Sequence, residues 1–203
     1  MERDLPLFIV ASIVSAYWSC VFLMAGRSWV KFRGPAGVIP KTRWERWMWL
    51  VWVPNTAAWV ALPWSAGNSA LDTAAGQAGA GLWLVLARWL LALLAVVAFG
   101  LTVRCWLAMG SSWTMAVNPK KKTVLITDGA FSVVRHPIYA LSLLLMTCTV
   151  ATVASLPMLL VGGIHFAMIF AKTASEERFL LSIHGEAYRQ YCRRTNRYVP
   201  LCH

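Results

Sequence analysis

Residues 138–171 read IYALSLLLMTCTVATVASLPMLLVGGIHFAMIFA, an apolar stretch that lies between two polar blocks. If this stretch forms two helices joined near Ser155-Leu156-Pro157, the chain enters a lipid bilayer and returns to the face from which it came. At about 1.5 Å per residue the stretch supplies about 51 Å of helix, against about 60 Å for two complete crossings. We therefore expect a short helical hairpin that is tilted or continues into the polar residues beside it.

The two polar blocks form the candidate functional region. The first spans residues 127–139 and contains Arg135-His136-Pro137-x-Tyr139, in which the proline suits the first position of the following helix. The second begins with Glu176-Glu177 and ends at Pro200. Because the hairpin returns the chain to its starting face, we expect the blocks to meet at the lipid boundary and to carry the function there.

The remainder of the chain is also apolar. The 203 residues are 59% hydrophobic, and the mean hydropathy is +0.58, which predicts an all-α integral membrane protein with one domain, 1–203. We expect about five transmembrane helices, at residues 5–25, 47–64, 81–107, 138–154 and 157–172, followed by a C-terminal cytoplasmic helix. Residues 124–127, before Asp128-Gly129, suit a short surface strand and turn.

The charge pattern predicts the topology. The net charge of +11 comes from basic residues beside the apolar segments, which indicates contact with anionic lipid and control of topology rather than a nucleic-acid partner. The loop of residues 27–46 is rich in Lys and Arg and is predicted to be cytoplasmic, with the N-terminus outside and the C-terminus inside. The five cysteines are scattered and predict neither a metal site nor a disulfide framework.

Three local features leave alternatives open. Glu177, His184, Tyr188 and Tyr191 share one face if residues 175–194 form one helix, but Gly185 leaves open a break in that helix. This segment is either an amphipathic interfacial helix or part of a site, and Glu176-Glu177 favours a cationic partner. Arg88 is explained by snorkelling or by a buried ion pair, and His165 is interpreted as a packed histidine.

The order of motifs between residues 104 and 200 resembles that of the membrane methyltransferases. These include isoprenylcysteine carboxyl methyltransferase and the phospholipid N-methyltransferases. The resemblance covers about half the chain, which makes this the expected cofactor-binding half. It rests on Arg104…Gly110-x-x-Trp113, Gly129-Ala130-Phe131-x-x-x-Arg135-His136-Pro137-x-Tyr139, Glu176-Glu177, and Gly185-x-x-Tyr188-x-x-Tyr191-x-x-Arg194 with a closing Pro200.

The resemblance implies a cytoplasm-facing pocket for S-adenosylmethionine and a lipid-like acceptor that enters from the bilayer side. By matching position, the expected cofactor-binding residues are Arg135, His136, Pro137, Tyr139, Glu176 and Tyr188. The expected catalytic residues are Glu177 and Arg194, with Arg194 facing the acceptor. Two positions depart from the family pattern, because Ala130 replaces a usual Pro and Leu141 replaces a frequent Gly against which the cofactor would pack.

The acceptor and two rival functions stay open at this stage. A carboxylate acceptor, such as that of a prenylcysteine-type thioether, needs an arginine to orient it, whereas a lipid amine or thiol needs a base such as Glu177 or a histidine. Tyr188-x-x-Tyr191-Cys192 followed by Arg197-Tyr198-x-Pro200 also resembles the sterol reductases, which use NADPH. The other rival is a non-catalytic lipid-binding membrane protein. Adjacent helical residues point about 100° apart, so the sequence does not decide which of Glu176 and Glu177 faces the pocket.

Overall fold

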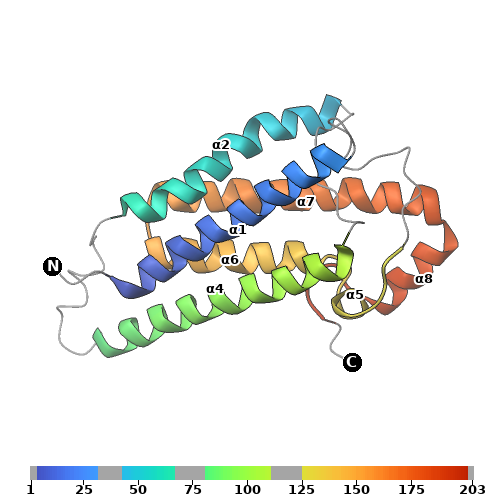
Figure 1. Ribbon diagram of the computed structural model, residues 1–203. Helices are drawn as coiled ribbons and strands as arrows, with labels where there is room; N and C mark the ends of the chain where they lie inside the picture. Colours follow the sequence, from blue (N-terminus) through green and yellow to red (C-terminus); the bar gives the residue numbers. More distant parts are fainter. Residues whose placement is uncertain (1–3, 32–42, 67–80, 111–124, 201–203) are drawn as a thin grey trace.

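The computed structural model describes residues 4–31, 43–66, 81–110 and 125–200 of the protein (Figure 1). The described helices are α1 (Leu5–Lys31), α2 (Arg43–Ser65), α4 (Gly81–Met109), α5 (Ala130–Val133), α6 (Pro137–Val153), α7 (Leu156–His184) and α8 (Glu186–Arg194). The all-α prediction is confirmed. No strand occurs among these residues, and the strand predicted near 124–127 is wrong for 125–127, which have no regular structure, while Val124 lies outside the described residues.

Three helices are long and apolar enough to cross a membrane, judged by length and composition. They are α1, α4 and α7, of which α4 and α7 have 29 residues each. Helix α6 is apolar but has only 17 residues. Helix α2 is not among the three, and it carries Pro54 and Pro63 within its length. The protein is therefore an all-α membrane protein, and its predicted count of five crossings stays a prediction.

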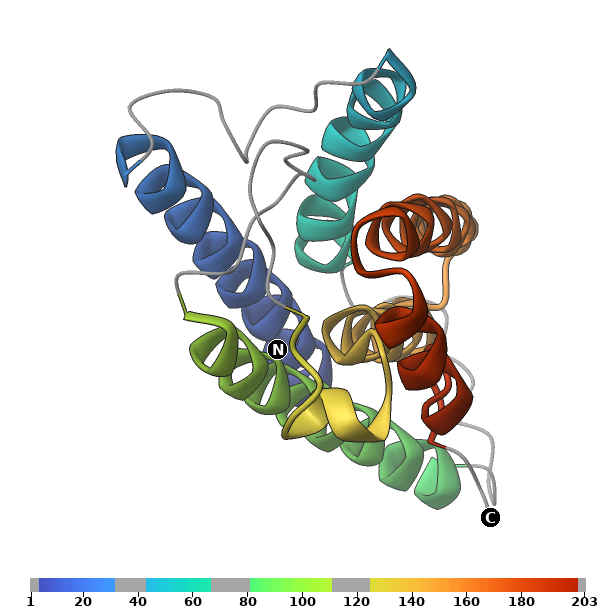
Figure 2. The ribbon, with the colours of Figure 1, turned by 90° about the vertical axis from the view of Figure 1, so that its right-hand side faces the viewer.

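The long helices pack into a bundle whose centre is aromatic. Helix α4 packs on α1 and α6, while α7 packs on α2 and α6 (Figures 1 and 2). The side chain of Trp59 is fully buried, and its ring lies 5.6 Å from that of Trp18 and 6.0 Å from that of Tyr17. By contrast, α4 exposes large apolar side chains such as Leu82 and Leu93 on its outer face. A surface of that kind suits contact with lipid tails.

Arg88 forms an ion pair with Asp4, at the start of α1, and both side chains are mostly buried. Of the two explanations for this arginine, the structure supports the buried ion pair rather than snorkelling. The pair ties α4, two turns from its start, to the beginning of α1, and α1 and α4 pack together along the bundle.

The predicted hairpin is present between α6 and α7. Ala154 ends α6 in a left-handed conformation with φ of 47°, and the Ser155 hydroxyl caps α7 by accepting a hydrogen bond from the Met158 amide at 3.3 Å. Gly162 packs so closely on α6 that an added Cβ would lie 2.7 Å from Val150 Cγ2. Because α7 is much longer than α6, its C-terminal turns extend past Lys172, as the sequence predicts, and carry Glu176 and Glu177.

Gly185 separates α7 from α8. It adopts a φ of +52°, which favours glycine, and Figure 1 shows α8 turning back at the end of α7. The alternative of one continuous face from Glu177 to Tyr191 is therefore wrong, because two helices meet at this turn. Tyr188 and Tyr191 are both buried, so α8 places its aromatic side against the rest of the protein.

Candidate active site

The segment after α8 folds back alongside the Arg135-His136-Pro137 motif. The Arg135 amide donates to the Asn196 carbonyl at 2.8 Å, and the His136 amide donates to the Arg197 carbonyl at 3.0 Å. Val134 and Asn196 also form an isolated parallel bridge. The two polar blocks therefore meet, and the hairpin supplies the reason, because it brings the end of α7 beside the start of α6.

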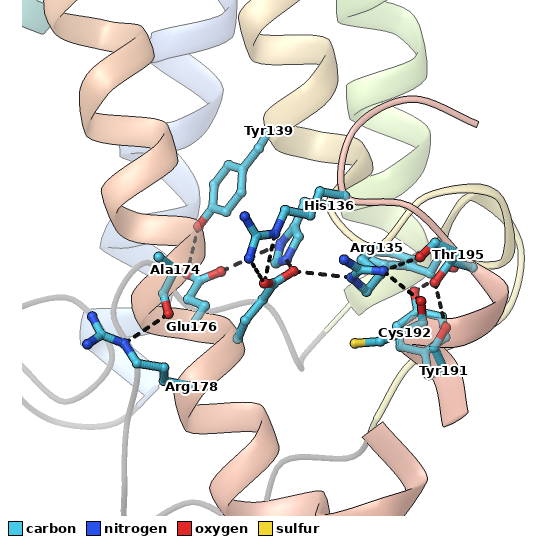
Figure 3. A network of polar contacts seen from close by, with 12 residues as sticks. Arg135, His136, Tyr139, Ala174, Glu176, Arg178, Tyr191, Cys192 and Thr195 are labelled. Carbon is cyan, nitrogen blue, oxygen red and sulfur yellow. Dashed lines mark hydrogen bonds and ion pairs between the residues drawn. The ribbon is translucent and has the colours of Figure 1, made fainter. Parts of the chain in front are cut away.

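Glu177 contacts both polar blocks at this meeting point, and Figure 3 shows the surrounding network of polar contacts with Arg135, His136 and Glu176. Its Oε1 accepts a hydrogen bond from Arg135 Nε at 3.1 Å, and its Oε2 accepts one from Arg197 Nε at 2.8 Å. The His136 Nε2 atom lies 3.4 Å from Oε1. The carboxylate is only 12% exposed, so two guanidinium groups neutralise a charge that is largely removed from solvent.

Glu176 has a separate set of partners. Its Oε1 accepts a hydrogen bond from the Tyr139 hydroxyl at 2.6 Å and lies 3.5 Å from Lys172 Nζ. The ring of Tyr139 stacks on that of His136, with the centroids 5.6 Å apart and the planes 14° from parallel. The adjacent glutamates therefore divide the cluster, because Glu177 binds the arginines and Glu176 binds the tyrosine and the lysine.

Several buried polar atoms around the two glutamates make no hydrogen bond within the described part of the chain. They are Thr173 Oγ1, Tyr188 Oη and Tyr198 Oη, whereas His136 Nε2 faces the Glu177 carboxylate at 3.4 Å. The Tyr198 ring lies 6.3 Å from that of His136. Leaving such a group buried without a partner costs about 1–3 kcal/mol, so polar atoms of a bound ligand would stabilise this arrangement. The residues present thus fit a ligand with several hydrogen-bonding groups.

The two tyrosines of α8 are neutral over the ordinary pH range. Burial raises the pKa of Tyr188, and the nearby Glu177 carboxylate raises it further. Burial raises the pKa of Tyr191 to about 12. The Tyr191 hydroxyl donates to the Phe131 carbonyl at 2.5 Å, which fixes α8 against α5, whereas the Tyr188 hydroxyl stays available to a ligand.

Most of the predicted site residues gather in this cluster. Arg135, His136, Tyr139, Glu176, Glu177 and Tyr188 contribute side chains to it, and Pro137 is buried as the first residue of α6. Arg194 differs, because it is exposed at the end of α8 and makes no hydrogen bond or ion pair with the cluster among the residues that the structure describes. Its predicted role at the acceptor stays a prediction.

Sequence reasoning did not assign site roles to Lys172, Thr173, Arg197 or Tyr198. Arg197 and Tyr198 belong to the Arg197-Tyr198-x-Pro200 pattern, which was a usable signal. The fold-back of residues 195–198 on the start of α6 was not predictable from periodicity, because these residues are in neither a helix nor a strand.

His165 belongs to a different, deeper environment inside the bundle. It is 1% exposed, its Nε2 lies 3.1 Å from Ser142 Oγ, and its ring centroid is 4.7 Å from that of Trp59. The interpretation of His165 as a packed histidine is confirmed.

Comparison with known proteins agrees with the resemblance seen in the sequence. Residues 90–182 match the model of the isoprenylcysteine carboxyl methyltransferase (ICMT) family. This stretch runs from within α4 to the last turn of α7 and includes His136, Tyr139 and both glutamates. The recognition of a membrane methyltransferase pattern in this half of the chain is confirmed.

Two curated proteins are also similar to part of the chain. The cobalt-zinc-cadmium resistance protein CzcN of Cupriavidus metallidurans is 33% identical over 94 residues, which are 45% of this chain and 43% of that protein. The nickel-cobalt-cadmium resistance protein NccN of Alcaligenes xylosoxydans xylosoxydans is 28% identical over 110 residues, 54% of this chain and 50% of that protein. The similarity thus spans about half the length of these relatives. In the described residues no group of three or more His, Cys, Asp and Glu side chains is placed to hold a metal ion.

Proposed function

We propose that the protein moves a methyl group from S-adenosylmethionine to a lipid-like or small apolar acceptor. The observation that carries this proposal is the cluster of paired glutamates, His136 and Tyr139 at one end of an apolar helix bundle, with buried polar atoms that lack partners. The match of residues 90–182 to the family supports it. The predicted topology would put this cluster on the cytoplasmic side.

The residues of the cluster suit the parts of S-adenosylmethionine, which supplies an activated methyl group on a positively charged sulfur. Glu176 has the charge to bind the amino group, and the stacked rings of His136 and Tyr139 present aromatic faces to a cation or a base. Thr173, Tyr188 and Tyr198 offer hydroxyl groups for its polar atoms.

The protein's contribution to methyl transfer is position and the exclusion of water. Holding two reactants in line lowers the entropic part of the barrier and needs neither a metal nor a covalent intermediate. The cluster lies where α6 and α7 leave the apolar bundle, so an acceptor in the bilayer and a polar cofactor can approach it from different sides. A carboxylate, an amine or a thiol of the acceptor is the receiving group in this proposal.

Glu177 and His136 have different roles under this proposal. Glu177 accepts hydrogen bonds from two guanidinium groups, which hold it ionised and make it a weak proton acceptor. It therefore positions the arginines and supplies negative charge beside the cofactor. His136 lies between the two glutamates and is the group available as a base if the acceptor is an amine or a thiol.

The test is calorimetric titration of S-adenosylmethionine, S-adenosylhomocysteine and NADPH into detergent-purified protein. We expect saturable binding of both adenosyl ligands, loss of that binding in His136→Ala, and unchanged binding in the exposed control Arg189→Ala. Binding of NADPH alone would support the reductase alternative. Absence of binding by all three would support a non-catalytic lipid-binding protein and overturn the proposal.

A further inference from the structure

Helix α8 has two faces of opposite chemistry. Its nine residues include three arginines and one glutamate. Tyr188 and Tyr191 are buried against the protein, whereas Arg189, Arg193 and Arg194 are exposed, and we call these three arginines the basic face. The two interpretations of this segment, an interfacial helix or part of a site, are therefore compatible, because each describes one face of the same helix.

The buried face of α8 belongs to the candidate active site. The Cys192 carbonyl accepts a hydrogen bond from Arg135 Nη1 at 3.2 Å, and the Tyr191 hydroxyl donates to the Phe131 carbonyl at 2.5 Å. The buried Tyr188 lies near the Glu177 carboxylate. A contact that steadies α8 therefore also steadies the partners of Arg135 and Glu177.

The basic face lacks counter-charge. Arg189 pairs with Glu186 at 3.1 Å, but Arg193 and Arg194 make no ion pair or hydrogen bond within the part of the chain that the structure describes. Arg189 and Arg193 are four positions apart, where like charges destabilise a helix. A helix of nine residues is also shorter than the length of about 12–15 residues below which an isolated helix is marginal in water. An external anion would therefore stabilise α8.

The position of α8 identifies the source of that anion. Figures 1 and 2 show that α1, α4 and α7 end on the same side of the bundle as α8. About 20 residues cross a hydrocarbon core of about 30 Å, so α7, with its 29 residues, extends about 13 Å past that core. Because α8 turns back from the end of α7, it returns to the layer of lipid head groups on the predicted cytoplasmic side (Figure 1).

We infer that the basic face of α8 binds the head groups of anionic phospholipids, and that this contact tightens cofactor binding in the neighbouring cluster. Each basic residue near an anionic membrane surface strengthens the attraction about fivefold. A zwitterionic lipid has no net charge and supplies no such attraction. The inference concerns regulation of the candidate site, so its second half rests on the proposed function.

The first experiment measures the lipid contact without cofactor. Amide hydrogen exchange of residues 186–194 is compared between protein in nanodiscs of phosphatidylcholine and protein in nanodiscs that also contain phosphatidylglycerol. We expect exchange to be about fivefold slower in the anionic nanodiscs, and the difference to shrink as salt is added. The double variant Arg189→Gln/Arg193→Gln loses most of this difference, whereas Arg189→Lys/Arg193→Lys, with the charge unchanged, keeps it. Arg194 is left intact because its predicted acceptor role is tested separately.

The second experiment measures the coupling to the site by titration of S-adenosylhomocysteine. This ligand lacks the sulfonium charge, so an anionic membrane does not concentrate it near the protein. We expect about fivefold tighter binding in the anionic nanodiscs for the wild-type protein and the lysine variant, and equal binding in both membranes for the glutamine variant. Binding of the glutamine variant in phosphatidylcholine as tight as that of wild type reports that it is folded. Glycerol 1-phosphate added to phosphatidylcholine nanodiscs is expected to change neither measurement.

The outcomes separate this inference from the proposed function. Equal exchange of α8 in the two membranes, or a difference that persists in the glutamine variant, overturns the inference and makes the basic face a solvated surface. An effect of glycerol 1-phosphate as large as that of the anionic lipid also overturns it, in favour of a soluble phosphate compound. If anionic lipid protects α8 but S-adenosylhomocysteine binds equally in both membranes, the regulation is overturned. If that ligand binds in neither membrane, the methyl-transfer proposal fails while the lipid contact stands.

Discussion

Arg135 Nε lies 3.1 Å from Glu177 Oε1, although 42 positions separate the two residues in the sequence. The same arginine donates through Nη1 to the main-chain carbonyls of Cys192, at 3.2 Å, and Thr195. One guanidinium group therefore joins the start of α6, the C-terminal part of α7 and the end of α8. The chemistry of the candidate site depends on this junction, because it fixes the glutamate pair relative to the Arg135-His136-Pro137 motif.

Arg135→Lys is expected to destabilise the junction. A lysine ammonium is a single point of charge and cannot satisfy the carboxylate and two carbonyls as a planar guanidinium does. The loss of one charged, mostly buried hydrogen bond corresponds to about 2 kcal/mol. Thermal unfolding in detergent measures it as a lower Tm, and Arg193→Lys, at an exposed position of α8, is the matched control. An unchanged Tm in Arg135→Lys would contradict the importance of this junction.

The two adjacent glutamates are expected to respond differently to the same substitution. Glu177→Gln leaves Arg135 and Arg197 without their shared counter-charge, so we expect a lower Tm together with weaker cofactor binding. Glu176→Gln keeps a hydrogen bond to Tyr139 but removes the negative charge beside Lys172, so we expect a smaller fall in Tm than in Glu177→Gln and at least a tenfold loss of S-adenosylmethionine affinity. Calorimetry and thermal unfolding of both variants separate the two roles. Similar changes in both variants would contradict the assignment of separate roles to Glu176 and Glu177.

Much of the fold was predictable because it follows from local sequence patterns. The proline at 137 starts α6, and Ser155 caps α7. The apolar stretch is too short for two complete crossings, so α7 continues past Lys172 into polar residues. The site was predictable in part, through His136, Tyr139 and the glutamate pair. The contribution of residues 195–198 was not, because it depends on a long-range fold-back that no helical or strand period encodes. The break at Gly185 was left open, since a glycine inside a helical pattern is tolerated or ends the helix according to its tertiary contacts.

For two arginines near the C-terminus, the role predicted from the sequence differs from the contacts seen in the structure. Arg197 hydrogen-bonds Glu177, while Arg194 is exposed and lies outside the cluster. We expect Arg197→Ala to weaken S-adenosylmethionine binding several-fold, a modest effect because its side chain is 52% exposed and solvent screens the pair. Arg194→Ala should bind the cofactor as wild type does. Labelled-methyl transfer then tests its predicted acceptor role, and full transfer by Arg194→Ala would reject that role.

The close contact between α6 and α7 at Gly162 predicts that a larger residue there destabilises the protein, and the neighbouring Gly163 provides the control. A Cβ at position 162 would lie 2.7 Å from Val150 Cγ2, whereas one at position 163 would have nothing within 4 Å. Gly162→Ala must displace the Val150 side chain or push the two helices apart, at a cost of about 1–3 kcal/mol, while Gly163→Ala gains up to about 1 kcal/mol of helix propensity. We therefore expect the Tm to fall in the first variant and to hold or rise in the second.

The same pair of variants should also differ in cofactor binding. Tyr139 is on α6 and Glu176 is on α7, so a change in the separation of the helices lengthens their 2.6 Å hydrogen bond. Gly162→Ala is expected to lose S-adenosylmethionine affinity even at temperatures where it is fully folded, and Gly163→Ala to keep it. If Gly162→Ala bound the cofactor normally, the distance between Glu176 and Tyr139 would not depend on how closely α6 and α7 pack in the hairpin.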